Sequence, residues 1–315
     1  MRFSMGAALG EAFGLMRRRP AAVLVWGLIV AGPGFAALAL ILPAMGDLIA
    51  HMPADPSADD PAFDRLMMTH MVQFQLASML GNVGQLLGMA LAYAAVMRAV
   101  LRPSERSFFS LRIGMDELRV AVVGLAIGVG RYVVMIAVLL LGAALVASLW
   151  GVGKGVAIGA GLVLGVGAFV ALLWALARLS LIAPASVLDR DFAFERGWRL
   201  ARGQGWPLLG LMLVIILIVL AVEVVLILIA AAGLVAAIGA HAGDWPPAGD
   251  NPFPHIHAWL AVNWPWLALV GLVATWLYGA FLTLSVAPFA SACRQLTAAQ
   301  AASAAPAEAE SGSPA

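Results

Sequence analysis

The sequence predicts an all-α polytopic integral membrane protein with six transmembrane helices. Hydrophobic residues make up 63% of the 315 positions and charged residues only 11%, about half the charged fraction of an average soluble protein. The formal net charge of +1 provides no basic excess for binding phosphate backbones, so no nucleic-acid partner is expected. The lipid bilayer is therefore the expected solvent and first partner of this chain.

Six apolar runs are long enough to cross a hydrocarbon core, which takes roughly 20 apolar residues in a helix. They lie near residues 21–45, 72–100, 120–150, 156–182, 207–238 and 264–289. Together they predict a single transmembrane domain over residues 1–294. Residues 295–315 are rich in Ala, Ser, Glu and Pro and have no apolar periodicity, which predicts a disordered cytoplasmic tail.

The positions of the arginines predict the orientation, because basic loops near the ends of spans stay in the cytoplasm. Fifteen of the 18 basic residues lie in the amino-terminal segment, after span six, or between spans two and three and spans four and five. Arg65 and Lys154 lie on the other side, and Arg131 lies within span three. Both termini are therefore expected in the cytoplasm. A cleaved signal peptide is the alternative for the first run, but its apolar stretch exceeds the 7–15 residues typical of such a segment.

A short amphipathic stretch precedes each pair of spans, near residues 3–16, 108–119 and 194–202. Each stretch has apolar residues on one helical face and arginines on another, which is typical of helices that lie among lipid headgroups. An ordinary cytoplasmic helix packed on protein is the alternative. The pattern favours three degenerate units of interfacial helix plus hairpin. The arginines expected to contact headgroups are Arg17, Arg18, Arg19, Arg112, Arg199 and Arg202.

Pairs of glycines spaced by four indicate close helix packing, since small residues let helix backbones approach each other within a membrane. They occur at Gly84/Gly88, Gly124/Gly128, Gly155/Gly159 and Gly161/Gly165, which predicts that spans two to four form the tightly packed centre. In span one, Gly32-Pro33-Gly34 predicts a kink or break, because proline removes a backbone donor and clashes with the preceding turn.

Two charged residues lie within the expected hydrocarbon region, Arg131 in span three and Glu223 in span five. Each would cost roughly 2.5–3.5 kcal/mol if it faced lipid near the bilayer centre. The hypothesis is that they form an ion pair with a structural role, and a role in transport is the alternative.

A polar stripe follows one helical face of span two, at Gln75, Ser78, Asn82 and Gln85. Such a stripe either forms hydrogen bonds to neighbouring helices or lines a path for a solute. Interhelical hydrogen bonding is the simpler interpretation.

No catalytic residue, metal ligand or cofactor is predicted. The single cysteine, Cys293, excludes an intrachain disulfide and a cysteine-built zinc site. The histidines fall in the expected outer loops among aspartates, which leaves open a metal site or a proton-sensitive loop beside the simpler solvated loop. These histidines are His51, His70, His241, His255 and His257.

Two cytoplasmic stretches resemble a broad bacterial family. They are Phe3-Ser4-Met5-Gly6-Ala7-Ala8-Leu9 leading to residues 17–20, and Arg178-Leu179-Ser180-Leu181-Ile182-Ala183-Pro184 followed by Arg196-Gly197-Trp198. The resemblance is to the membrane domain of glycerophosphoryl diester phosphodiesterases and related uncharacterised polytopic proteins. It implies a six-helix membrane unit. The phosphodiesterase activity of that family belongs to a separate barrel domain, for which this chain has no soluble stretch of sufficient length.

The expected function is that of a non-catalytic scaffold or accessory protein of the bacterial inner membrane. It would act on a membrane-protein partner through its amphipathic helices at the cytoplasmic face. The alternative is a small-solute or ion transporter that uses Arg131, Glu223 and the polar face of span two.

Overall fold

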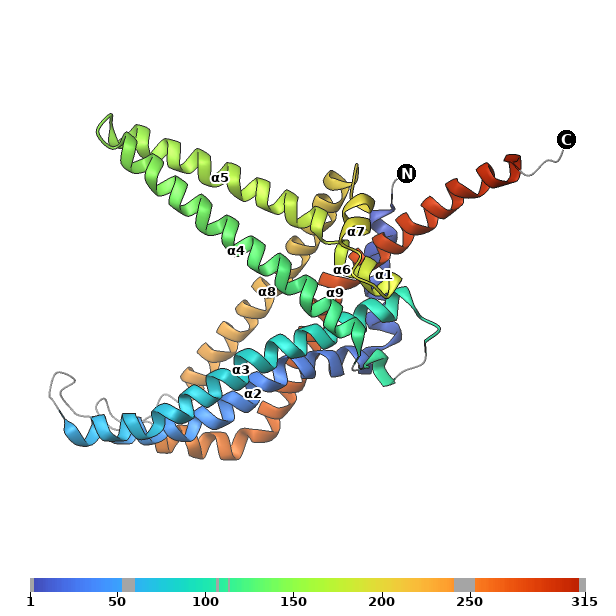
Figure 1. Cartoon of the computed structure of the whole chain (residues 1–315). Coiled ribbons are helices and arrows are strands. Elements are labelled where there is room, and N and C mark those ends of the chain that lie inside the picture. Colours follow the sequence, from blue (N-terminus) through green and yellow to red (C-terminus); the bar gives the residue numbers. More distant parts are fainter. Residues whose placement is uncertain (1–2, 53–59, 106–107, 113, 241–252, 312–315) are drawn as a thin grey trace. The chain divides into compact units, whose positions relative to one another are not determined.

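The computed structural model describes residues 3–52, 60–105, 108–112, 114–240 and 253–311, and within these ranges the chain forms helices and no strand. The predicted all-α polytopic class is confirmed, because six helices are long and apolar enough to cross a membrane. These helices contain α2 (Pro20–Ala50), α3 (Pro61–Leu101), α4 (Met115–Leu149), α5 (Lys154–Leu179), α8 (Gly205–Ala240) and α9 (Phe253–Ser311) (Figure 1). The shorter elements are α1 (Met5–Arg18), η1 (Phe108–Ser110), α6 (Ile182–Asp189) and α7 (Phe194–Leu200).

The helices divide into two compact units where the sequence predicts one domain. The first unit comprises Met1–Arg18, Tyr93–Ile216 and Thr283–Ala315, and the second comprises Arg19–Ala92 and Leu217–Leu282. Helices α3, α8 and α9 each contribute one end to the first unit and the rest to the second. The lengths of the apolar runs do not reveal this division, because α3, α8 and α9 each belong to both units.

In the second unit, α2 and α9 touch through their backbones. A Cβ atom added at Gly27 would meet the carbonyl oxygen of Thr275, and one added at Gly279 would meet the carbonyl oxygen of Val23. Such contacts require glycine on both helices, because any side chain would hold the two backbones apart. This pair was not among the glycine patterns identified in the sequence, since Gly27 and Gly279 stand on different helices.

Helix α3 packs on α2 through Gly84 and Gly88, as the sequence predicts. A Cβ atom at Gly88 would meet the carbonyl oxygen of Ile29, and one at Gly84 would lie 2.6 Å from the Cβ of Pro33. Helix α2 continues unbroken across Pro33, where the sequence predicts a kink or a break. A membrane environment favours an intact helix, since no water replaces lost backbone hydrogen bonds.

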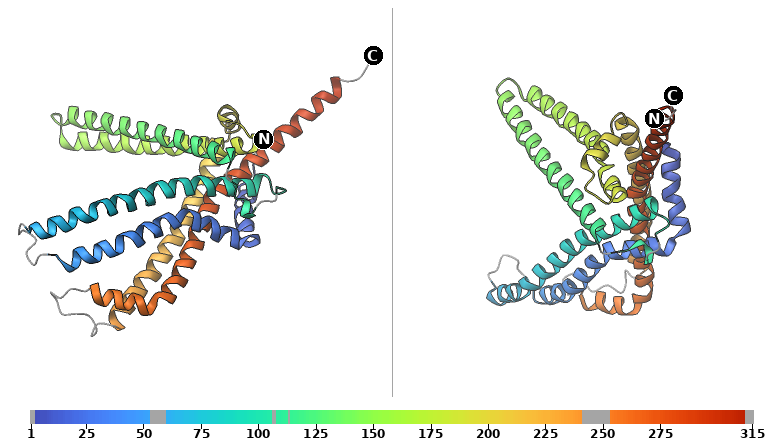
Figure 2. Two further views of the ribbon diagram at one scale, coloured as in Figure 1. Left: turned by 60° about the horizontal axis from the view of Figure 1, so that its bottom comes forward. Right: turned by 45° about the vertical axis from the view of Figure 1, so that its right-hand side comes forward.

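In the first unit, α4 and α5 form a long antiparallel hairpin (Figure 2). A Cβ atom added at Gly161 of α5 would lie 2.7 Å from Cγ2 of Val146 in α4. The other glycines predicted to pack closely in this hairpin have open space around them: Gly124, Gly128, Gly155, Gly159 and Gly165. Close packing of the predicted glycines is therefore confirmed in this hairpin only at Gly161, and a tight centre formed by spans two to four stays a prediction. Glycine spacing marks a face that permits close approach, but it does not specify whether a partner helix covers that face.

Two of the three amphipathic stretches form separate short helices, α1 and α7. The stretch at residues 108–119 does not. Phe109 and Ser110 adopt left-handed backbone angles, with φ of 52° and 58°, and α4 begins only at Met115. The apolar spacing that predicted one helix here comes from two elements. The three-unit repeat stays a prediction.

Helix α9 extends beyond Gln295 to Ser311, into the segment for which the sequence predicts a disordered tail. The physical reason is helix propensity. Alanine has the highest intrinsic propensity of all residues, and alanines dominate residues 298–305. The missing apolar periodicity, on which the prediction of disorder rests, does not reflect this propensity.

Candidate functional site

A cluster of buried ion pairs joins the end of α3 to the start of α4 in the first unit. Arg98 is only 4% exposed, and its Nη2 lies 2.5 Å from Oε1 of Glu117. The Nε and Nη2 atoms of Arg98 also donate hydrogen bonds to the carbonyl oxygen of Ser110, at 3.1 and 2.8 Å. The guanidinium group of Arg98 therefore holds the carboxyl end of η1.

Two further arginines pair with the carboxylate of Asp116. Nη2 of Arg102 lies 2.7 Å from one carboxylate oxygen of Asp116, and Nη1 of Arg119 lies 3.0 Å from the other. Arg102 also donates to the carbonyl oxygen of Val187 in α6, at 2.6 Å. A charge-assisted bond to α6 thus fixes the position of this short helix against the ends of α3 and α4.

Glu105 forms the exposed edge of the cluster. Its Oε1 accepts hydrogen bonds from Arg190 at 2.6 Å and from Arg102 at 3.2 Å. Burial raises the pKa of Glu105, but the hydrogen bonds and charges of Arg190 and Arg102 outweigh this effect and hold the pKa below its ordinary value of 4.5. Glu105 therefore carries its negative charge at neutral pH.

The two ends of the chain contribute a second set of contacts within the first unit. Arg294 of α9 donates to the carbonyl oxygen of Val100 at 2.5 Å and lies 3.3 Å from Glu11 of α1. The backbone N–H of Ser4 donates to Oε1 of Gln295 at 2.8 Å. Helix α1 is thereby tied to α9, and α9 to the end of α3.

From the sequence, most of these arginines indicate only the orientation of the chain, and their acidic partners are not predicted. The available signal was the presence of Glu105, Asp116 and Glu117 within an arginine-rich segment. Such a mixture of charges predicts pairing, but it does not predict which arginine meets which carboxylate. The cluster positions helices and contains no nucleophile beside a base, so it resembles a structural element rather than a catalytic one.

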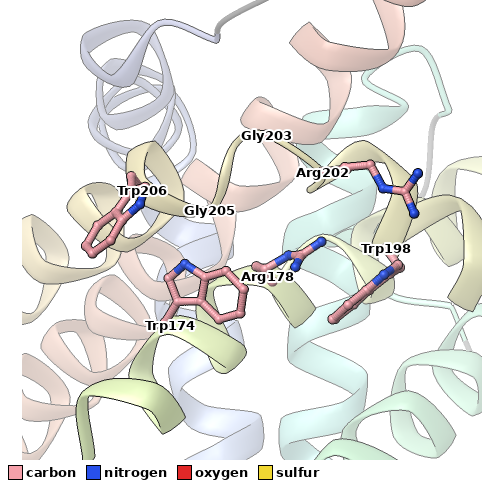
Figure 3. Close-up of a pocket in the computed structure, with 7 residues that line it drawn as sticks. All are labelled: Trp174, Arg178, Trp198, Arg202, Gly203, Gly205 and Trp206. Atoms are coloured by element: carbon pink, nitrogen blue, oxygen red, sulfur yellow. The ribbon is translucent and has the colours of Figure 1, made fainter. Parts of the chain in front are cut away.

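A pocket of about 420 Å³ lies in the first unit, where α5 ends and α8 begins. Figure 3 shows its lining, in which Arg178 lies between two indole rings. The guanidinium carbon of Arg178 is 4.9 Å from the ring centre of Trp174 and 4.1 Å from that of Trp198, both within cation–π range. The lining residues are Trp174, Arg178, Trp198, Arg202, Gly203, Gly205 and Trp206.

The backbone closes one side of the pocket. Gly203 has a φ of +76°, a left-handed conformation that glycine adopts at low cost. A Cβ atom at Gly205 would lie 3.0 Å from Nε1 of Trp174, so the chain passes close to this indole. Of the residues that line this pocket, only Arg202 is predicted from the sequence as a site residue. The shared Trp-x3-Arg spacing at residues 174–178 and 198–202 was the signal that could have found the site.

Of the two intramembrane charges, Arg131 lies in the first unit and Glu223 in the second. The guanidinium group of Arg131 lies 5.4 Å from the ring centre of its neighbour Tyr132. Arg131 also lines an apolar pocket of about 570 Å³ between α4 and α5. Glu223 is exposed on α8. The ion pair between Arg131 and Glu223 stays a prediction.

The polar stripe of span two forms hydrogen bonds at two points. Nε2 of Gln85 donates to the Tyr278 hydroxyl at 3.4 Å, between α3 and α9 of the second unit. Asn82 donates to Ser78 of its own helix at 3.2 Å. Gln75, Ser78 and Asn82 are exposed, because the face of α3 that packs on α2 is the glycine face. The Gln85 contact favours interhelical bonding, and a path for solutes stays a prediction.

The arginines expected to contact headgroups are all exposed. Arg18 pairs with Glu11 at 2.9 Å, and Arg199 pairs with Glu195 at 3.5 Å. Only Arg202 of this set lines the tryptophan pocket. Contact with lipid stays a prediction for all six: Arg17, Arg18, Arg19, Arg112, Arg199 and Arg202.

The structure describes the side chains of two of the predicted outer-loop histidines. His51 contacts the carbonyl oxygen of Asp47 at 2.8 Å, and His70 lies 3.5 Å from the carboxylate of the same residue. Within the described residues no group of three His, Cys, Asp or Glu side chains could hold a metal ion. His241 and the side chains of His255 and His257 lie outside what the structure describes.

Comparison with known proteins provides no identification: no family model, no curated protein and no solved structure matches the chain. The resemblance to the membrane domain of glycerophosphoryl diester phosphodiesterases therefore stays an expectation. The chain is a multi-pass membrane protein by its six apolar helices.

Proposed function

We propose that this chain is a non-catalytic scaffold or accessory protein of the bacterial inner membrane, which acts on a membrane-protein partner through helices at its cytoplasmic face. The single observation that supports this proposal is the ion-pair cluster of the first unit. It ties α6 to the ends of two apolar helices through Arg102, and it contains no reactive constellation.

The first unit carries aromatic side chains that a partner could cover. Phe192 and Phe194 stack with ring centres 6.4 Å apart, and Phe13 of α1 is 49% exposed. Aromatic side chains bordered by charges are typical of interaction sites. The cytoplasmic orientation of this face rests on the arginine distribution, and the assignment to bacteria rests on composition.

The proposal is tested by site-specific photo-crosslinking in intact cells. A photoreactive amino acid is placed at Phe13 or Phe192, with Leu139 of α4 as a control position in an apolar span that is 64% exposed. We expect a reproducible protein adduct of one identity from Phe13 and Phe192 and none from Leu139. Adducts with lipid alone at all three positions would contradict the scaffold proposal.

The orientation is tested separately. A reporter enzyme that is active only in the periplasm is fused after Ala315, and an equivalent reporter that is active only in the cytoplasm is fused at the same place. We expect only the cytoplasmic reporter to be active. Activity of the periplasmic reporter would place the proposed partner surface on the wrong side of the membrane.

A further inference from the structure

We infer that the pocket of Trp174, Arg178, Trp198, Arg202 and Trp206 binds the phosphate group of an anionic phospholipid headgroup. This inference rests on the geometry of the pocket and does not require a protein partner. The shared chemistry is that of a phosphate group, which a soluble phosphate could also supply. The position of the pocket favours the lipid.

The first argument is the charge of the pocket. Its lining contains two guanidinium groups, Arg178 and Arg202, and no acidic side chain. Among the described residues neither arginine forms an ion pair, and Nε of Arg178 is buried without a hydrogen-bond partner. An unpaired buried donor is costly unless a ligand or water satisfies it.

Three other arginines of the first unit provide a contrast. Arg98, Arg102 and Arg119 are each nearly buried, and each lies within ion-pair distance of a carboxylate. The Nε atoms of Arg102 and Arg119 also lack a hydrogen-bond partner, but another guanidinium nitrogen of each meets a carboxylate. Arg178 is partly buried and, among the described residues, has no carboxylate within ion-pair distance, which is expected if an anion from outside the chain binds it.

The second argument is the orientation of Arg178. Trp174 and Trp198 interact with the guanidinium group at 4.9 and 4.1 Å between its carbon and each ring centre. These ring contacts leave the guanidinium N–H groups in need of an acceptor. The planar guanidinium group can bind two oxygens of a phosphate group at once.

The third argument is the level of the pocket in the membrane. It lies where one candidate span, Lys154–Asp189, approaches its end and the next, Gly205–Gly233, begins. Tryptophan is enriched at this level, beside the lipid headgroups, and Trp206 is 73% exposed. The pocket also adjoins the amino-terminal end of α8, whose unsatisfied N–H groups favour an anion. Its volume of about 420 Å³ falls in the range of small-molecule sites, about 300–1,000 Å³.

The test measures lipid binding to the full-length protein in detergent micelles. Native mass spectrometry with added phosphatidylglycerol provides the affinity, and phosphatidylcholine of the same acyl chains is the lipid control. We compare the unmodified protein with Arg178→Gln, Arg202→Gln and Arg196→Gln. Arg196 is the matched control, because it lies on the same short helix as Trp198 and pairs with Asp189 but does not line the pocket.

We expect Arg178→Gln and Arg202→Gln each to lower the affinity for phosphatidylglycerol by about tenfold or more, since each removes a charge-assisted contact. Arg196→Gln should leave the affinity within about twofold. Phosphatidylcholine should bind the unmodified protein at least tenfold more weakly, because its headgroup carries no net negative charge. Inorganic phosphate at high concentration should compete, with a much lower affinity than the lipid.

Three results would overturn the inference. Equal affinity for the two lipids would exclude a site selective for anionic headgroups. An equal loss in Arg196→Gln would show a general effect of positive charge. Tighter binding of inorganic phosphate than of phosphatidylglycerol would assign the pocket to a soluble phosphate. If Arg178→Gln fails to fold, Arg178→Lys takes its place, because lysine keeps the positive charge but lacks the planar guanidinium group. Unchanged affinity in both Arg178→Lys and Arg202→Gln would then contradict the inference.

Discussion

The contact between α2 and α9 makes Gly27 a position where a single methyl group should destabilise the second unit. An added Cβ at Gly27 would lie 2.9 Å from the amide nitrogen of Gly279 and 3.0 Å from the carbonyl carbon of Thr275. Ordinary contacts begin at 3.4 Å, and the carbonyl oxygen of Thr275 lies closer than either of these atoms, so the helices must separate by more than about 0.5 Å at this point. No rotamer change relieves the contact, because the opposing atoms belong to the backbone.

The expected magnitude follows from two opposing effects. Overpacking of a fixed contact costs about 1–3 kcal/mol, and a rigid backbone favours the upper part of that range. Alanine in place of glycine within a helix stabilises by about 1 kcal/mol. Gly27→Ala should therefore lower the free energy of unfolding by about 1–2 kcal/mol.

A matched control stands on the same helix. An added Cβ at Gly34 has nothing within 4 Å, so Gly34→Ala should show only the gain in helix propensity, about 1 kcal/mol. The two variants should differ by about 2–3 kcal/mol, which corresponds to about 4–12 °C in Tm at about 2–4 °C per kcal/mol. Thermal unfolding in detergent, followed by far-UV circular dichroism, measures the difference. A Tm of Gly27→Ala that equals or exceeds that of Gly34→Ala would refute the backbone contact.

Two further predictions concern the charge cluster of the first unit. Arg98→Met leaves the Glu117 carboxylate buried without its ion-pair partner and should cost about 3–5 kcal/mol, whereas Arg112→Met at an exposed position should cost less than about 0.5 kcal/mol. The buried Cys293 thiol reacts with a thiol reagent only after the protein unfolds, so the temperature at which it becomes labelled measures the stability of each variant. Similar temperatures for the two variants would contradict the proposed role of Arg98. Because the pKa of Glu105 is held below 4.5, its stabilising contribution is fully present above that pH and is lost as the pH falls through the lowered pKa. The difference in Tm between the unmodified protein and Glu105→Gln should therefore be constant above pH 4.5 and shrink below it, and a difference that persists in stronger acid would exclude this linkage.

The class and the number of spans follow from composition and run length alone. A chain with 63% hydrophobic residues must satisfy its backbone polar groups internally when lipid surrounds it, and long helices accomplish this locally. Each such helix therefore leaves its own signal in the sequence. The packing of Gly84 and Gly88 on a neighbouring helix was predictable for the same reason, since the two glycines share one face.

Partner choice, in contrast, follows from the tertiary structure. Gly27 and Gly279 are separated by most of the chain, and Arg102 meets Val187 across 85 residues, so no local period links either pair. The same holds for Arg178, whose two aromatic neighbours come from different helices. A local pattern specifies which face of a helix permits contact, and the packing of the helices then selects which arginines meet a carboxylate and which remain available to an anion from outside the chain.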